Sequence, residues 1–179
     1  LDSVLKELRN SMVVALPWLN GFAFIRAYKN TIDNDSGILE SIPQVYMGNG
    51  EYYDCRINDN LIAHSFFYTD NSEVVNYSSL KRGNFLSTRD VSLILSVDLG
   101  KLKTDYSGDY IYTESIKKEL INVLKKSTNV QSIKHYIDSP IEEVYRGFTI
   151  TNDKQYDKFP FASIRIDFTA QYKYDQICS

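Results

Sequence analysis

The stretch FASIRIDFTAQYKY, residues 161–174, has the most regular pattern in the chain. From residue 162 onward every odd position is polar and every even position is apolar or aromatic: Ala162, Ile164, Ile166, Phe168, Ala170, Tyr172 and Tyr174. Because side chains alternate between the two faces of a β-strand, this pattern predicts a strand with one buried face and one wet face. Most strands contain about 5 to 6 residues, whereas this one would extend roughly 40 Å at about 3.4 Å per residue.

Other segments also have strand-like composition. Residues 21–29 are aromatic and β-branched, which predicts a strand. Residues 42–68 predict a hairpin that turns at Gly48-Asn49-Gly50, followed by a strand in LIAHSFFYT. The alternating segment VSLILSVDLG, residues 91–100, and the segment VQSIKHYI, residues 130–137, predict two more strands.

The N-terminal segment, residues 2–16, predicts an amphipathic helix. Its apolar stripe consists of Val4, Leu5, Leu8, Met12 and Ala15. Either Asp2 or Ser3 is expected to cap this helix. Pro17 is expected to end it, because proline disfavours helical conformation at the residue before it.

Two further helices are expected in the second half of the chain. Thr113 is the expected N-cap of the longer one, and Lys125 and Lys126 lie at its negative end. Its buried stripe is expected to consist of Ile116, Leu120, Val123 and Leu124. The sequence Ser139-Pro140-Ile141-Glu142 matches a capping box, and Gly147 supplies a stop, so residues 140–146 predict a short helix.

The order of these elements predicts an α+β fold. Strands cluster instead of alternating with helices, which favours a mainly antiparallel sheet packed with two main helices. The order is helix, strands, helix, strand, with a long C-terminal strand, and the 179 residues fit a single domain spanning 1–179. The even face of the last strand is expected to pack on the two main helices, which carry matching apolar stripes.

A sheet packed with two main helices does not account for two segments of the chain. Residues 69–90 predict a long polar connection with a basic tip at Lys81 and Arg82. Loops longer than about 12 to 15 residues are uncommon in compact domains unless they have a function, so we interpret this one as an interaction loop. Residues 127–160 are interpreted as an insert that binds a neighbouring protein.

Composition narrows the possible partners. Hydrophobic residues make up 43% of the chain, enough for a globular core. A net charge of −3 argues against a general nucleic-acid binder, which needs basic residues to neutralise phosphates. The apolar run at residues 12–16 is far shorter than the about 20 residues that span a bilayer, so we expect no membrane association. The fourteen tyrosines either reflect an AT-rich genome or serve as contact residues on a surface.

The residues that could carry chemistry do not form a catalytic pattern. His64 and Ser65 are neighbours on a predicted strand and therefore point to opposite faces. Cys55 is interpreted as a buried thiol, and Cys55 and Cys178 as two free thiols in a reducing compartment. His64 and His135 are each interpreted as a structural or surface residue, and no zinc or calcium ligand spacing is complete. We therefore expect no enzyme, no catalytic residue, no cofactor and no metal.

The order of elements resembles that of the tail-terminator or tail-completion proteins of tailed phages, which form a ring at the head-to-tail neck. The segments that carry the resemblance are VLKELRNSM running into LPWLNGFAFIRAY, the hairpin IPQVYMGNGEYYDCRI, the helix TESIKKELINVLKKS after VSLILSVDL, and FPFASIRIDFTAQYKYD. They cover most of the chain as an order of elements and contain no signature motif. The segment 127–160 and the overall size depart from the simplest members.

This resemblance implies a structural virion protein, assembled in the host cytoplasm. Copies would form a homo-oligomeric ring that joins head and tail, next to neck, portal or tail proteins, and DNA would pass through without specific binding. A slightly acidic chain suits such a channel because it repels phosphate. The residues expected at a subunit interface or channel wall are Lys81, Arg82, Arg165, Asp167, Gln171 and Lys173.

Two other functions remain open at this stage. The first is a monomeric or dimeric binding module that uses surface tyrosines to hold carbohydrate or protein ligands. The second is an enzyme whose catalytic residues come from distant parts of the chain. Self-association separates the ring from the binding module, because rings close through contacts between two different surfaces of neighbouring copies.

Overall fold

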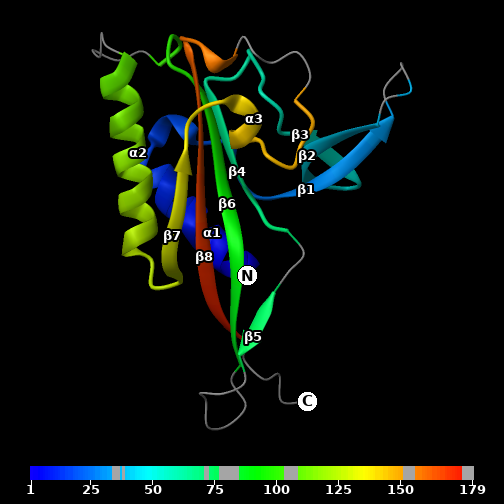
Figure 1. The fold of residues 1–179 in the computed structure, drawn as a ribbon, viewed down its shortest axis with the longest axis vertical. Coiled ribbons are helices and arrows are strands. Elements are labelled where there is room, and N and C mark those ends of the chain that lie inside the picture. Colours follow the sequence, from blue (N-terminus) through cyan, green and yellow to red (C-terminus); the bar gives the residue numbers. More distant parts are fainter. Residues whose placement is uncertain are drawn as a thin grey trace.

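The computed structural model describes residues 1–33, 37, 39–70, 73–76, 85–102, 109–150 and 156–174. Lys81, Arg82 and Cys178 lie outside these residues. Within them the chain forms one sheet of eight strands with helices packed on it, an α+β fold, as the sequence predicts (Figure 1).

The elements follow one another in the expected order. The helical elements are α1 (Asp2–Ala15), the short 3-10 helix η1 (Pro17–Leu19), α2 (Asp109–Lys126) and α3 (Ile141–Val144). The strands are β1 (Ala23–Asp33), β2 (Leu39–Gly48), β3 (Glu51–Asp54), β4 (Ala63–Tyr68), β5 (Val74–Asn76), β6 (Phe85–Asp98), β7 (Val130–Ile137) and β8 (Phe161–Tyr174).

The sheet is built around the long pair β6 and β8. The strand order is β3-β2-β1-β4-β6-β8-β7, and β5 pairs with β6 outside this path. The two long strands are antiparallel and pair along their whole length, from Asp98 opposite Phe161 to Phe85 opposite Tyr174. Among the described strands, β1 and β4 form the one parallel pair. The length of β8 is therefore matched by an equally long neighbour.

The larger core lies between α1, α2 and one face of this sheet. The even-numbered side chains at 164–172 of β8 and the odd-numbered side chains at 91–97 of β6 point into it, because directly paired residues share a face. Ile164, Ile166 and Phe168 are each at most 1% exposed. They pack with buried leucines of both helices, such as Leu8 and Leu120, so the predicted packing is confirmed.

A smaller core lies on the opposite face, beneath α3. Ile141, Val144 and Tyr145 pack there against Phe66 of β4 and Ile94 of β6. After α3 the chain turns at Gly147, whose φ of +100° is favourable for glycine. Gly147 therefore lies in the turn that follows α3 and is not the residue at which the helix ends.

The two halves of β1 pair with different strands. Its first half pairs with β4 in the main sheet, and the register shifts between Ala23 and Arg26. Its second half, residues 28–33, pairs with β2, which in turn pairs with β3. These three segments project from the body of the molecule, on the right in Figure 1. We call residues 28–33, 39–48 and 51–54 the arm.

The predicted long connection at residues 69–90 is wrong at two places. Residues 74–76 form β5, and residues 85–90 form the first part of β6. Residues 85–90, of which 87–90 are polar, become a strand because residues 169–174 of β8 extend beyond the hydrophobic segment 91–98 and pair with them. The pairing of backbone groups here outweighs the polar side-chain composition.

The predicted helix caps are also wrong. α1 begins at Asp2 with Leu1 as N-cap and has no side-chain cap. Asp2 instead forms an ion pair with Arg26, at 3.6 Å. α2 begins at Asp109, so Thr113 lies inside the helix. The N-cap of α3 is Pro140, and the helix ends at Val144, two residues earlier than predicted.

A distant side chain caps α3 in place of Ser139. The Asp157 carboxylate accepts a hydrogen bond from the backbone N–H of Ile141, at 2.7 Å. Replacing Asp157 with Ala removes this acceptor, so we expect the free energy of unfolding to fall by about 1 kcal/mol. Urea unfolding of the variant measures the loss. Asp157→Asn keeps an oxygen acceptor, and an equal loss in that variant would contradict a capping role.

Candidate functional site

The structure separates the predicted interface residues on β8. Arg165 and Asp167 lie under the segment that contains α3, whereas Gln171 and Lys173 lie at the other end of the strand. Lys173 is exposed and Gln171 is partly exposed. Lys81 and Arg82 are outside the described residues, so the structure does not relate them to this face.

The prediction that the odd face of β8 is wet is wrong for its first half. Ser163 and Arg165 are each only 6% exposed. The reason is that α3 and the turn after it cover this part of the sheet, which the strand pattern alone does not reveal. Arg165 is therefore an internal residue, while contact roles for Gln171 and Lys173 stay predictions.

The guanidinium of Arg165 binds four groups at once. Its Nε donates to the Asp167 carboxylate at 2.8 Å, and its Nη2 donates to Ser92 Oγ at 2.8 Å. Its Nη1 donates to the backbone oxygens of Arg146 at 3.1 Å and Val144 at 3.4 Å. Burying a charge is costly unless it is paired and hydrogen-bonded, and this arrangement meets both conditions. Arg165 thus fastens the end of α3 to the sheet.

A polar pocket of about 280 Å³ opens beside this network. Arg146 Nη2 lies 3.5 Å from the Asp167 carboxylate, and Lys134 Nζ lies 2.6 Å from that of Asp90. The hydrogen bond from Lys134 holds the pKa of Asp90 below its usual value. Because the cations here have acidic partners within the protein, we interpret the pocket as a structural ion-pair cluster.

His64 and Cys55, nine residues apart in the sequence, come into contact in the smaller core. His64 Nε2 lies 3.0 Å from the Cys55 backbone oxygen and 3.3 Å from Tyr145 Oη. A carbonyl oxygen only accepts, so Nε2 carries the proton. Tyr145 Oη also lies 2.7 Å from Ser96 Oγ. His64 is thus part of a buried polar chain that crosses the core.

The electrostatics of this pair oppose nucleophilic chemistry. Burial lowers the pKa of His64 to about 4, so the imidazole is neutral near pH 7. Burial also raises the pKa of the Cys55 thiol, which disfavours the reactive thiolate. Cys55 is fully buried, as predicted. In the described part of the chain, no three His, Cys, Asp or Glu side chains gather as metal ligands would.

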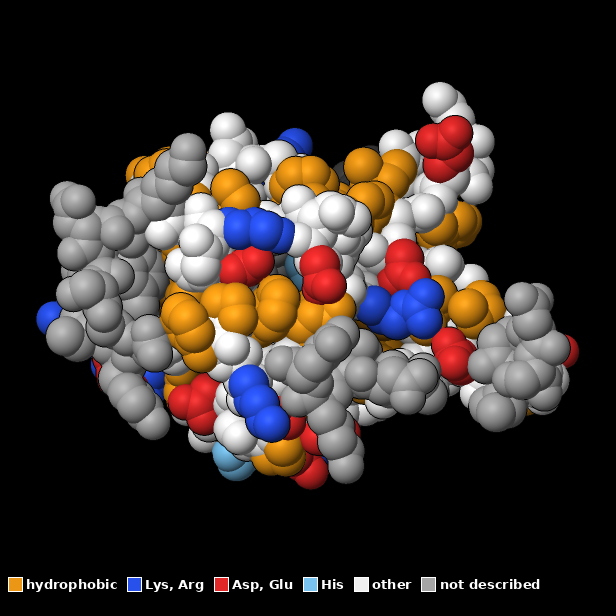
Figure 2. All heavy atoms as spheres, turned by 90° about the horizontal axis from the view of Figure 1, so that it is seen from above, with side chains coloured by type: hydrophobic (Ala, Val, Ile, Leu, Met, Phe, Trp, Pro, Cys, Tyr) orange, Lys and Arg blue, Asp and Glu red, His pale blue; other side chains and the backbone are white. Residues whose placement is uncertain are grey.

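The arm carries the main group of exposed apolar side chains. Ten large hydrophobic residues are exposed among the described residues, and half of them are on the arm: Tyr28, Leu39, Tyr46, Met47 and Tyr52. Tyr46 and Tyr52 lie opposite each other on β2 and β3, with ring centroids 5.3 Å apart. Hydrophobic and acidic side chains are visible on the right of Figure 2, the side on which the arm projects.

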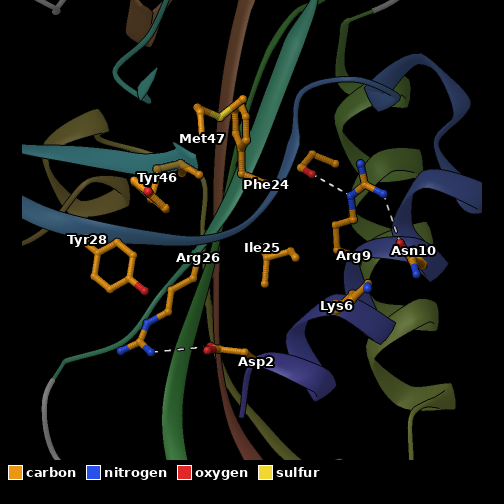
Figure 3. A pocket seen from close by; sticks show the side chains of 12 residues that line it. Asp2, Lys6, Arg9, Asn10, Phe24, Ile25, Arg26, Tyr28, Tyr46 and Met47 are labelled. Carbon is orange, nitrogen blue, oxygen red and sulfur yellow. Dashed lines mark hydrogen bonds and ion pairs between the residues drawn. The ribbon is translucent and has the colours of Figure 1, made fainter. Parts of the chain in front are cut away.

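A groove of about 440 Å³ lies between α1 and the base of the arm (Figure 3). From α1 it is lined by Asp2, Lys6, Arg9 and Asn10, and from β1 and β2 mainly by Arg26, Tyr28, Tyr46 and Met47. It therefore combines three cations and one acid with aromatic and thioether surface. Of the polar residues in this groove, the sequence pattern predicted a role for Asp2 alone, as a helix cap, although the high tyrosine content indicated surface contacts in general.

No family model matches this sequence, and no characterised protein is significantly similar to it. Within the described residues, no helix has the length and apolar composition needed to cross a membrane.

Proposed function

We propose that this chain is a structural virion protein that assembles into a ring at the neck or tail end of a tailed phage. The ring would join head and tail and let DNA pass. The observation that carries this proposal is the projecting arm, which exposes five large apolar side chains away from both cores. The order of elements resembles that of tail-terminator proteins, and this resemblance is the reason for proposing a ring in a phage neck or tail.

The arm suits a contact between copies of the chain. Exposed apolar surface that gathers on one part of a protein is typical of interaction sites. The arm of one copy would contact a different surface on the next copy. Such a contact between two different surfaces favours a head-to-tail arrangement. Repeated head-to-tail contacts close into a ring when the rotation between copies allows it.

The buried polar groups favour a structural role over catalysis. Arg165, His64 and Cys55 each have partners inside the protein and lie beneath α3. The net charge of −3 agrees with a channel through which DNA moves without being held. Assembly in the host cytoplasm with neck, portal or tail proteins follows from the proposed place in the virion.

The alternative is a monomeric or dimeric binding module. The exposed tyrosines of the arm, Tyr28, Tyr46 and Tyr52, also suit carbohydrate or protein ligands. The two functions differ in self-association. A chain that stays monomeric at high concentration, and also with neck and tail proteins, would favour the binding module.

Light scattering over a range of concentrations tests the role of the arm. In the double variant Leu39→Ser/Met47→Ser we expect self-association to weaken about a hundredfold or more, since each buried side chain of this size contributes about 1.5 to 3 kcal/mol. Both side chains are more than half exposed, so the fold should survive. Val74→Ser, at an exposed position on β5, is the matched control. Equal weakening in the control would contradict a specific role of the arm.

A further inference from the structure

The groove at the base of the arm has an excess of positive charge. Lys6 is exposed, and Arg9 is held in place because its Nε donates to the Ala23 oxygen at 2.7 Å. Arg26 lies over the ring of Tyr28 at 5.2 Å and pairs with Asp2 at 3.6 Å. Figure 3 shows these cations on both walls of the groove.

One donor in this groove is unsatisfied. Arg26 Nε is buried and has no hydrogen-bond partner among the described residues. Because this nitrogen is closed to solvent, an acidic ligand would meet the exposed Lys6 ammonium and the part of the Arg26 side chain that is exposed. The groove therefore fits a ligand that carries a carboxylate together with an apolar group.

The outer end of the arm carries both a carboxylate and an apolar side chain. Residues 30–55 contain five acidic residues and no lysine or arginine. Asp33 and Leu39 form the last pair of the β1–β2 ladder, and both are exposed. Arg56 binds Glu40 and Asp54, so those two acids are neutralised within the same molecule. Asp35 lies outside the described residues, and Glu51 lies at the opposite end of the arm, where it pairs with Gly48. At the outer end, Asp33 is an exposed carboxylate beside the apolar Leu39.

The outer end of the arm cannot reach the groove of the same molecule. Arg26 and Asp33 are on the same strand, seven residues apart. At about 3.4 Å per residue they are separated by roughly 24 Å. The strand leads away from α1 toward the tip of the arm, as Figure 1 shows. The occupant therefore has to come from another molecule.

We propose that the groove receives the outer end of the arm of a second copy of this chain. Asp33 of the incoming arm faces Lys6 and Arg26, and its Leu39 packs on Met47 and the neighbouring aromatic surface. Each copy then offers an arm and accepts one, which is the head-to-tail contact that generates rings. This inference rests on the proposed ring function and assigns the two surfaces that meet.

Charge reversal tests this pairing without disturbing the core. Lys6→Glu and Asp33→Lys each place like charges together in the contact, and we expect each to weaken self-association about tenfold. The double variant Lys6→Glu/Asp33→Lys restores opposite charges and should recover most of the loss. Light scattering and sedimentation measure the association. Lys118→Glu, an exposed lysine on α2, is the control for net charge.

The outcomes separate this inference from the ring proposal. Loss in both single variants and recovery in the double variant supports the pairing. If the charge variants associate like the wild type while Leu39→Ser/Met47→Ser does not, the pairing is overturned and the ring proposal stands. A wild-type protein that never associates overturns both. Loss of single-stranded DNA binding in Lys6→Glu, with association unchanged, would assign the groove to nucleic acid and also overturn the pairing.

Discussion

Replacing Arg165 with Met is expected to lower the free energy of unfolding by about 3 to 5 kcal/mol. The substitution leaves Asp167 partly buried without its closest charged partner, at 2.8 Å. It also removes the donors to the Val144 and Arg146 oxygens, which hold the end of α3 on the sheet. Met fills a similar volume, so the loss reflects the broken polar contacts and not a cavity.

Urea unfolding of the purified variant measures this effect. Lys173→Met is the matched control because it lies on the same face of β8 and is exposed. A surface change of this kind is expected to alter stability by no more than about 0.5 kcal/mol. If the two variants lose similar amounts, Arg165 does not fasten α3 to the sheet as the geometry indicates.

Lowering the pH from 6.5 to 4 is expected to destabilise the protein by about 3 kcal/mol through His64 alone. Burial lowers the pKa of His64 from its ordinary 6.5 to about 4 in the folded state. Between these values the unfolded chain binds a proton at this position and the folded chain does not. The contribution is therefore constant above pH 6.5, decreases as the pH falls to 4, and does not change further below pH 4.

The variant His64→Gln isolates this contribution from that of the carboxylates. Glutamine does not titrate and keeps an N–H that can donate to the Cys55 oxygen. We expect its unfolding free energy to depend less on pH than that of the wild type between pH 4 and 6.5. Parallel pH dependences for the two proteins would show that His64 becomes protonated in the folded state or remains in contact with water.

Local patterns predicted most of the elements correctly. The alternation in 162–174 predicts the long strand and its buried even face, and the helical stripe in 2–16 predicts a helix that packs on a surface. The turn at residues 48–50 is confirmed because the backbone there has positive φ values, which glycine and asparagine tolerate. These features depend on neighbours in sequence, so the sequence alone contains the necessary information.

Features that depend on distant residues could not be predicted in this way. Asp157 caps α3 from outside the helix, and α3 covers Arg165 from another part of the chain. Residues 85–90 become a strand because β8 supplies the partner. The groove combines Lys6 of α1 with Arg26 of β1, and no sequence pattern links the two. Each of these contacts depends on how the elements pack.

Native mass spectrometry of the concentrated protein tests the central proposal most directly, because the mass gives the number of copies in each complex. A head-to-tail ring predicts one predominant complex of more than two copies, which dissociates in the variant Leu39→Ser/Met47→Ser. A protein that remains monomeric, or stops at a dimer, even when mixed with neck and tail proteins would contradict the proposal.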